Sequence, residues 1–288
     1  MVLNEPRSVW SLGALLGEGP VWVGDALWFV DIKSRKVHRF TPATGEKTSW
    51  DSPQQIGFLL PATSGFIAGL QSGLHRFDPT SARFTPLAEV EAHLPGNRLN
   101  DGTVDPSGRL WFGSMHDGEI DKSGAFYRFH DGAVRDAGID GIAITNGPAL
   151  SPDGRLLYFV DTLSGTMDVA DVGANGTLSN TRPFVRIDPA DGFPDGPTVD
   201  AEGCLWIGLY AGWQARRYSP AGVLLETVRF PVGNITKLAF GGEDLRTVFA
   251  TTASQKLTRA ELNRQPQAGD LFSFQVDTPG VPCPLVAC

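Results

Sequence analysis

Short apolar runs recur along this chain of 288 residues, each after a turn, and a second phrase follows most of them. The first kind of run reads LWFV (27–30), LWFG (110–113), LYFV (157–160) and LWIG (205–208). The second reads VHRF (37–40), LHRF (74–77), FYRF (126–129) and ARRY (215–218), with LFSF (271–274) as a weaker copy. Alternation with period two, in aromatic and β-branched residues, indicates β-strands.

The spacing of these phrases predicts the architecture. If Arg39 marks the first copy and Ser273 the sixth, the five intervals average about 47 residues, within the range of β-propeller blades. TMDVADV (166–172) occupies the position of the expected fourth copy. Apolar residues with helical spacing occur only in a short stretch around Leu257 to Leu262. We therefore predict an all-β fold, a six-bladed β-propeller with a central channel, rather than a β-sandwich.

A propeller must close its ring. The opening strand RSVWSL (7–12) can pair in the last blade with GDLFSFQV (269–276), which removes an exposed sheet edge. The sequence therefore predicts that residues 1–288 form a single propeller domain with no internal linker.

Composition narrows the class of protein. A net charge of −8, a pI of about 5.1 and the lack of a Lys/Arg run argue against a nucleic-acid partner. The most apolar window, residues 57–70, is too short and broken to span a bilayer, and the first residues carry no evident secretory signal. Three sparse cysteines favour a reducing cytoplasm; Cys283 and Cys288 could pair, but we expect free thiols.

Four polar residues share one register among the repeats. Each lies ten or eleven residues before an equivalent apolar residue of the next strand, namely Trp28, Trp111, Leu157 or Trp206. The four polar residues are Glu18, Asn100, Asn146 and Asp195. Because equivalent residues of innermost strands lie at similar heights in a propeller, we expect these side chains to converge on the channel. Turn chemistry explains any single Asn-Gly, Asn-Asp or Asp-Gly pair, but Glu18 is a poor turn former, so the set favours a shared site.

The chemistry of this set favours a metal ion. Two neighbouring carboxylates repel each other unless a cation lies between them. Glu18, Asp195 and the amide oxygen of Asn146 supply three hard oxygen ligands, which suit Ca²⁺, Mg²⁺ or Mn²⁺ better than a structural zinc site. Arg98 lies two residues before Asn100, so on a strand it faces the same side and can anchor an oxygen-rich substrate; the alternative is a surface ion pair.

Four segments carry a family resemblance over most of the chain: LGEGPVW, NRLNDGTVDPSGRLWFGSM, TNGPALSPDGRLLYFVDT and PDGPTVDAEGCLWIG. They resemble the gluconolactonase/regucalcin (senescence marker protein) family of sugar lactonases, and FVDIKSRKVHRF (29–40) is similar to its bacterial aldonolactonases. The resemblance implies a six-bladed propeller with one catalytic divalent ion in the channel, which could be Ca²⁺, Mg²⁺, Mn²⁺, Zn²⁺ or Fe²⁺.

The resemblance also implies roles for particular residues. Glu18, Asn146 and Asp195 match the metal ligands, with Asp195 also the proposed general base, while Arg98 and Asn100 match the substrate-binding pair. The family's second acidic contact falls on Gly118, between Asp117 and Glu119, so no residue is assigned to that role.

The predicted function is divalent-metal-dependent hydrolysis of a sugar (aldono) lactone to the free sugar acid, with water activated by Asp195, by the metal, or by both. The partner is then a small-molecule lactone, and the chain is a monomer or a weak homo-oligomer. Two alternatives remain open: a regucalcin-like calcium-binding or regulatory protein without a physiological lactonase role, and a broader metal-dependent esterase.

Overall fold

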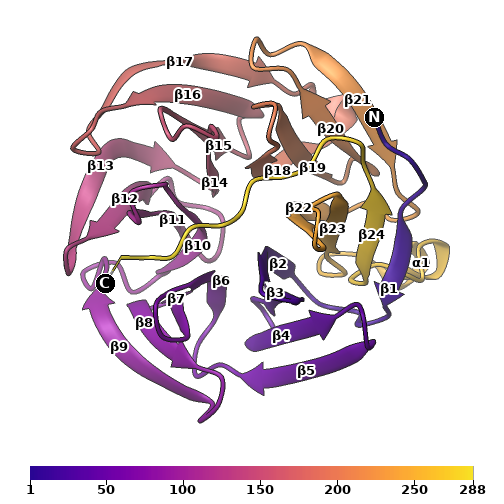
Figure 1. The fold of residues 1–288 in the computed structure, drawn as a ribbon, viewed down its shortest axis with the longest axis horizontal. Helices are drawn as coiled ribbons and strands as arrows, with labels where there is room; N and C mark the ends of the chain where they lie inside the picture. The colour runs from indigo at the N-terminus through magenta and orange to yellow at the C-terminus, as the bar shows by residue number, and fades with distance from the viewer. Residues whose placement is uncertain (288) are drawn as a thin grey trace.

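The strands of this protein surround a central axis, as its computed structural model shows for residues 1–287 (Figure 1). Four sheets each contain four strands in sequence order. They are β2 (Gly17–Val23), β3 (Ala26–Asp31), β4 (Lys36–Thr41) and β5 (Glu46–Asp51); β6 (Ile56–Pro61), β7 (Phe66–Leu70), β8 (Gly73–Asp78) and β9 (Arg83–Glu89); β10 (Asn97–Val104), β11 (Leu110–His116), β12 (Gly124–His130) and β13 (Ala133–Ile142); and β14 (Thr145–Leu150), β15 (Leu156–Asp161), β16 (Thr166–Val172) and β17 (Leu178–Arg186).

The fifth sheet contains eight strands in the order β1-β24-β23-β22-β18-β19-β20-β21. Their bounds are β1 (Arg7–Trp10), β18 (Phe193–Val199), β19 (Leu205–Tyr210), β20 (Gln214–Tyr218), β21 (Leu224–Arg229), β22 (Ile235–Gly241), β23 (Thr247–Thr252) and β24 (Leu271–Gln275). Its two halves meet at one parallel pair, Gly196 of β18 with Lys237 of β22. Two short helices complete the described elements, η1 (Pro189–Asp191) and α1 (Arg259–Arg264).

One strand from each group lies nearest the axis: β2, β6, β10, β14, β18 and β22 (Figure 1). Each contacts the next, and β22 contacts β2, so these inner strands form a closed circuit. The prediction of an all-β, propeller-like fold is confirmed, while the count of six blades stays a prediction. The helical stretch expected near Leu257 to Leu262 is α1, which begins after the capping box of Thr258 and Glu261.

The N-terminal strand completes the edge of the last sheet. β1 pairs antiparallel with β24, with Arg7 opposite Ser273. Trp10 then packs edge-on against Phe29 at a ring separation of 5.6 Å and against His38 at 5.4 Å. The expected partner of the opening strand is therefore present, and the extent of the domain stays a prediction.

The aspartate that directly follows two of the inner strands, β10 and β18, has a structural role. The indole nitrogen of Trp111 donates to Asp105 at 3.0 Å, and that of Trp206 donates to Asp200 at 2.9 Å. All four side chains are buried. Because each aspartate also holds its own turn through backbone amides, it ties the turn to the aromatic core of the next strand.

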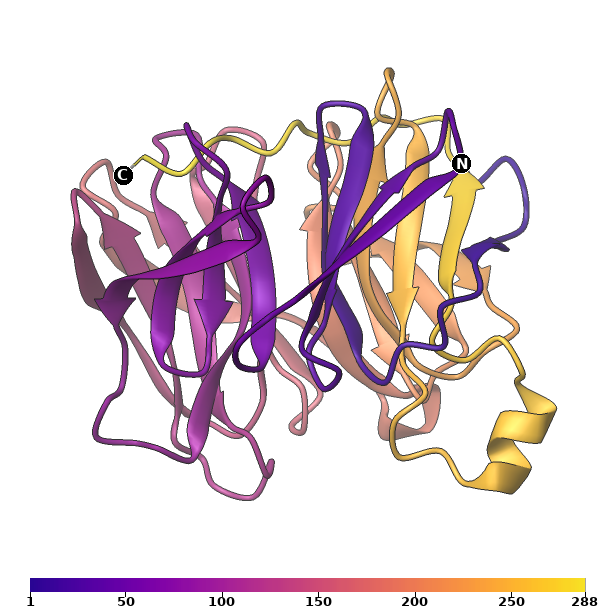
Figure 2. The ribbon, with the colours of Figure 1, turned by 90° about the horizontal axis from the view of Figure 1, so that it is seen from below.

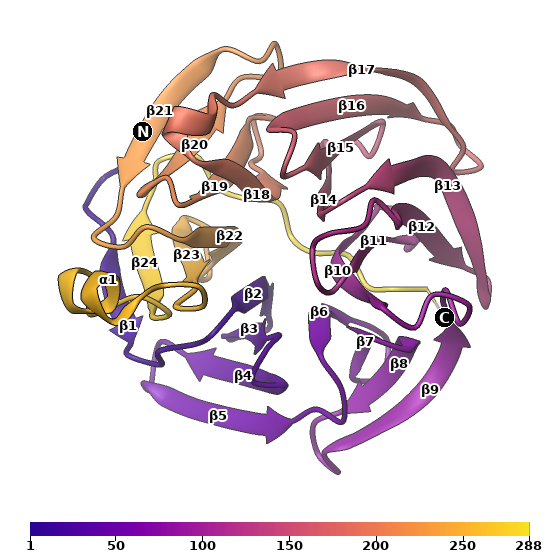
Figure 3. The ribbon, with the colours of Figure 1, turned by 180° about the vertical axis from the view of Figure 1, so that it is seen from behind.

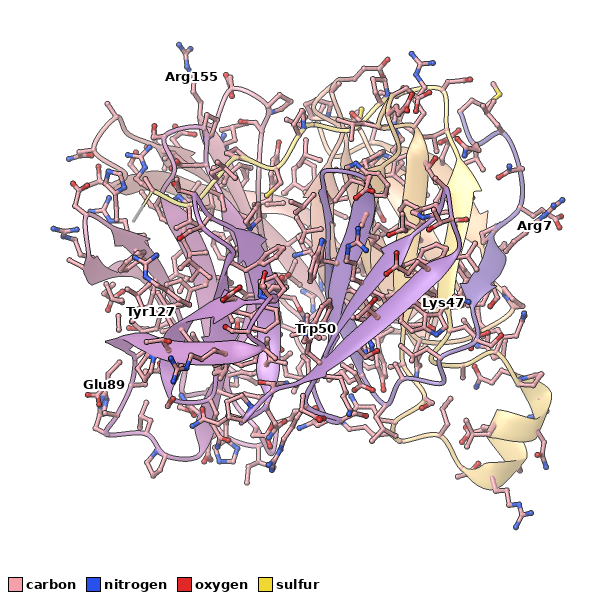
Figure 4. The ribbon with its side chains drawn as sticks, turned by 60° about the horizontal axis from the view of Figure 1, so that its bottom comes forward. Arg7, Lys47, Trp50, Glu89, Tyr127 and Arg155 are labelled. Atoms are coloured by element: carbon pink, nitrogen blue, oxygen red, sulfur yellow. The ribbon has the colours of Figure 1, made fainter. Side chains whose placement is uncertain are left out.

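The outer strands carry the polar surface, as Lys47, Trp50 and Glu89 illustrate (Figure 4). Trp50 is half-buried and stacks on Trp28 at 5.2 Å, while the Lys47 ammonium lies 5.6 Å from the centroid of the Trp10 ring. These contacts let amphipathic side chains cover the flanks of the sheets.

The two ends of the channel differ. The C-terminal segment crosses one end, while α1 and long loops surround the other (Figures 2 and 3). The crossing segment forms bridges at Gly280 with Asp200 and at Val286 with Ala62. No helix within residues 1–287 is long and apolar enough to cross a membrane.

The thiol prediction is confirmed in part. Cys204 is buried and Cys283 is half-buried, and both are free. The suggested pairing of Cys283 with Cys288 involves a residue outside the described range.

Replacing Trp10 should weaken ring closure. Trp10→Ala removes a half-buried ring that joins β1 to the first sheet, so we expect the free energy of unfolding to fall by about 2 kcal/mol in chemical denaturation. The exposed Leu3, in the same N-terminal segment, is the control, and Leu3→Ala should cost less than about 0.5 kcal/mol. Equal losses in the two variants would contradict a role of Trp10 in closure.

Candidate active site

Every inner strand bulges at the height of the candidate site. The register breaks between Glu18/Val21, Ile56/Phe58, Leu99/Gly102, Asn146/Ala149, Pro194/Pro197 and Ile235/Leu238. A bulge re-aims the side chains beside it, here towards the channel. Gly19 and Gly147 have φ values of 54° and 75°, a region that favours glycine. The repeated polar-Gly-Pro phrase is thus the signature of this bulge.

The five residues predicted from register and resemblance line one pocket of about 270 Å³. They come from four inner strands: Glu18, Arg98, Asn100, Asn146 and Asp195. The pocket lies at the end of the channel where α1 and the long loops are found, since Gln255 and Lys256 before α1 also line it (Figure 3). The five side chains therefore converge on one pocket, as expected from the sequence. Their chemical roles stay a prediction.

The two carboxylates of the pocket are buried and poorly partnered. Glu18 is 4% exposed and accepts one hydrogen bond, from the amide of Gly19 at 3.0 Å. Asp195 is 6% exposed, and its side chain accepts no hydrogen bond from residues 1–287. Burial, and next the charge of Asp101, raises the pKa of Glu18 to about 8. Burial, and next the charge of Glu18, raises the pKa of Asp195 well above its ordinary value.

Hydrogen bonds orient the amides of the site. The Asn146 amide nitrogen donates to the Thr162 hydroxyl at 2.9 Å. The Asn100 nitrogen donates to the Thr145 carbonyl at 2.6 Å and to Asn146 Oδ1 at 3.1 Å, and Asn100 Oδ1 accepts from Arg98 at 2.6 Å. With both nitrogens committed, Asn146 Oδ1 keeps a lone pair for another partner.

Arg98 is itself buried and pairs with the half-buried Asp117, unlike the surface pair considered as an alternative. Its Nε donates to Asp117 at 2.8 Å, and its side chain is almost inaccessible. Although burial raises the pKa of Asp117, hydrogen bonds from Gln55 and Lys33 and the charge of Arg98 lower it to about 2. The guanidinium is therefore rigid and faces the pocket from one fixed direction.

Sequence reasoning missed several residues of the pocket. Glu119 and Lys256 line it and form a salt bridge with each other, joining two loops that are far apart in the chain. Both have left-handed backbones, with φ values of 59° and 61°. The position of Glu119 beside Gly118 was a sequence signal for an acidic contact at this site. No sequence pattern pointed to Lys256 or Tyr210 as pocket residues.

The donor set fits a hard divalent cation. Glu18 and Asp195 are buried and together accept one hydrogen bond, from the amide of Gly19, so a cation would offset their charge when both are ionised. The oriented oxygen of Asn146 adds a neutral ligand. Residues 1–287 contain no group of three or more His, Cys, Asp and Glu side chains that could hold a metal. The candidate set, with two carboxylates and an amide, falls outside that description.

Comparisons with known proteins show a family and a fold for this chain. Residues 16–254 match the family model of the SMP-30/Gluconolactonase/LRE-like region. The chain is 33% identical over 280 residues to the 6-deoxy-6-sulfogluconolactonase of Pseudomonas putida, covering 95% of this chain and 96% of the relative. It is 35% identical over 273 residues to the L-arabinolactonase of Azospirillum brasilense, covering 92% and 90%. A calcium-binding protein, regucalcin, from Agrobacterium tumefaciens has the same fold, with a TM-score of 0.94, 29% identity and coverage of 99% and 100%.

Glu18 should make the metal-free protein less stable as the pH rises. Its folded pKa of about 8 exceeds the ordinary 4.5, so its contribution to stability is full below about pH 4.5 and is lost as pH rises through 8. Urea denaturation in EDTA should therefore give a smaller free energy of unfolding at about pH 8 than at about pH 5. Glu18→Gln should reduce that difference.

The matched control is Asp51→Asn, because Asp51 is exposed on an outer strand. It should retain the pH difference of the unmodified protein. A difference that survives in Glu18→Gln and changes in the control would contradict the assignment.

Proposed function

Because the chain belongs to the SMP-30/gluconolactonase/LRE-like family, we propose that it hydrolyses a sugar (aldono) lactone to the free sugar acid with one divalent metal ion. It is a lactonase-type enzyme, as its named lactonase relatives indicate. The observation that carries the finer proposal is the buried, poorly partnered pair Glu18 and Asp195 beside Asn146 in a pocket of about 270 Å³. A pocket of this size accepts a small ring rather than a polymer.

We further propose that the ring has six blades in one domain. The support is the single parallel pair that joins the two halves of the eight-stranded sheet, each of which has four strands. Separated at that pair, the halves resemble the other four sheets. A monomer or weak homo-oligomer in the cytoplasm, acting on a small molecule, accords with this proposal and with the two free cysteines.

Glu18, Asn146 and Asp195 would hold the ion through oxygen atoms. When bound, a divalent cation supplies Lewis-acid polarisation of the lactone carbonyl. The identity of the ion among Ca²⁺, Mg²⁺, Mn²⁺, Zn²⁺ and Fe²⁺ stays open, and the structural relative that is calcium-binding by name favours Ca²⁺ as the first to test.

Arg98 and Asn100 would orient the substrate ring. Arg98 donates through Nε to Asp117 and through Nη1 to Leu99 and Asn100. Within residues 1–287, no acceptor is hydrogen-bonded to its Nη2. This remaining donor can bind a ring oxygen or hydroxyl. Because the ion pair with Asp117 fixes the guanidinium, the substrate meets a donor that is already in place.

Asp195 would act as the general base. With no hydrogen-bonding donor on its carboxylate, one oxygen is free to take a proton from water while the other serves as a ligand. The water oxygen attacks the carbonyl carbon, the ring C–O bond breaks, and the proton passes to the departing oxygen.

A second candidate function is calcium binding without physiological lactone hydrolysis. The observation that favours it is the structural likeness to a regucalcin that is calcium-binding by name. The same three oxygen donors would serve that function. A broader metal-dependent esterase would use the pocket in the same way with less selective substrates.

Asp195→Asn should lower kcat by roughly 10²–10⁴-fold while the protein stays folded, because it removes the base. The variant should be no less stable than the unmodified protein in EDTA at about pH 8, since burial disfavours ionisation of the Asp195 carboxyl group and the amide carries no charge. Asp51→Asn is the control of matched chemistry and should retain activity. Full activity in Asp195→Asn with metal still bound would refute the base role.

A panel of aldonolactones separates the candidate functions. In a pH-stat assay, a lactonase releases acid from lactones with added divalent metal and stops when EDTA removes it. A protein that only binds calcium releases no acid in a metal-dependent way. A broad esterase hydrolyses aryl esters faster than any lactone in the panel.

A further inference from the structure

Two of the six inner strands, β10 and β22, have a charged residue where the bulge of the other strands has a glycine. In the other four strands the bulge contains a glycine: Gly19, Gly57, Gly147 and Gly196. In β10 the residue after Asn100 is Asp101, and in β22 the bulge contains Lys237. β10 and β22 are three places apart in the circuit of inner strands, so these two charged residues face each other across the axis.

Asp101 and Lys237 form a buried ion pair. The Lys237 ammonium donates to Asp101 Oδ1, with side chains 8% and 1% exposed for lysine and aspartate. The aspartate also accepts from the amides of Gly102 at 2.7 Å and Gly147 at 3.0 Å. The pair therefore connects opposite sides of the ring and fixes the backbone beside Asn146.

The lysine stem fills the space beside the candidate base. A Cβ on Gly196, the residue after Asp195, would lie 2.7 Å from Lys237 Cγ. Neither Asp101 nor Lys237 lines the pocket of about 270 Å³, whereas Lys237 lines a second cavity of about 530 Å³ at the other end of the channel. The ion pair thus lies beneath the pocket, between the two cavities.

The charges of the buried acids and of Lys237 around the axis sum to two negative charges. Three buried carboxylates interact with one another: Glu18, Asp101 and Asp195. The charge of Asp101 raises the pKa of both other acids, and the charge of Lys237 lowers both. Once the lysine offsets Asp101, two negative charges remain, which is the charge of one divalent cation.

We propose that Lys237 is a positioning residue, which neutralises Asp101 across the channel so that Glu18 and Asp195 together match one divalent cation. The inference rests on the metal site of the proposed function. It assigns the lysine a role in the strength of metal binding, beyond that of a spacer between strands.

The test is Mn²⁺ binding at about pH 8 without lactone, measured by calorimetry and by the EPR signal of free Mn²⁺. Asp101→Asn leaves the lysine charge without a partner, so Mn²⁺ should bind at least about tenfold more weakly. Lys237→Met leaves the charge of Asp101 uncompensated, so Mn²⁺ should bind at least about threefold more tightly than to the unmodified protein. The double variant Asp101→Asn/Lys237→Met restores the charge count and should bind within about threefold of the unmodified protein.

A control separates charge from general damage. Arg217 and Asp200 form another buried ion pair, at 2.8 Å, outside the pocket. Arg217→Met should lower the melting temperature and leave Mn²⁺ affinity unchanged. If Asp101→Asn does not fold, Lys237→Met alone decides, because it keeps both backbone hydrogen bonds of Asp101.

The outcomes are distinct. Three results overturn the inference while the metal site stands. They are unchanged affinity in folded Asp101→Asn, unchanged or weaker affinity in Lys237→Met, and failure of the double variant to recover the affinity of the unmodified protein. Absence of Mn²⁺ and Ca²⁺ binding in the unmodified protein overturns the proposed metal-dependent function as well.

Discussion

The burial of two carboxylates in one pocket is the constraint on which the charged centre of this protein depends. Glu18 and Asp195 are far apart in the sequence, yet both side chains are buried. Glu18 accepts one hydrogen bond, from the backbone amide of Gly19, and Asp195 accepts none from residues 1–287. An arrangement of this kind is costly unless a cation or protons offset the charge. The other polar groups of the channel compensate one another: Arg98 with Asp117, Lys237 with Asp101, and the amides with each other.

The backbone makes this arrangement possible. A bulge in every inner strand turns the side chains beside it towards the axis, and glycine in four of the bulges lets neighbouring backbones approach. A Cβ at Gly57, for instance, would lie 2.3 Å from the carbonyl oxygen of Asn100. The same local geometry therefore serves both packing around the axis and presentation of the site.

Much of the architecture could be predicted because it depends on local periodicity. The strand phrases predicted the all-β, propeller-like ring, and a common register predicted that Glu18, Asn100, Asn146 and Asp195 converge. What could not be predicted depends on loops and on pairings across the axis. The salt bridge of Glu119 with Lys256 joins two irregular loops, and the ion pair of Asp101 with Lys237 requires knowing which strands are opposite. The register also explains the position of each site residue without establishing its chemical role.

The pairing of β1 with β24 bears on how the molecule is made. β1, the first strand of the described residues, pairs with β24, the last of them, so ribosomal synthesis of this pair is separated by most of the described chain. Until β24 emerges, β1 has no neighbouring strand, and until β18 emerges, Glu18 has no Asp195 beside it. Assembly of the charged centre therefore follows synthesis of β18 and β22 rather than the folding of any early sheet.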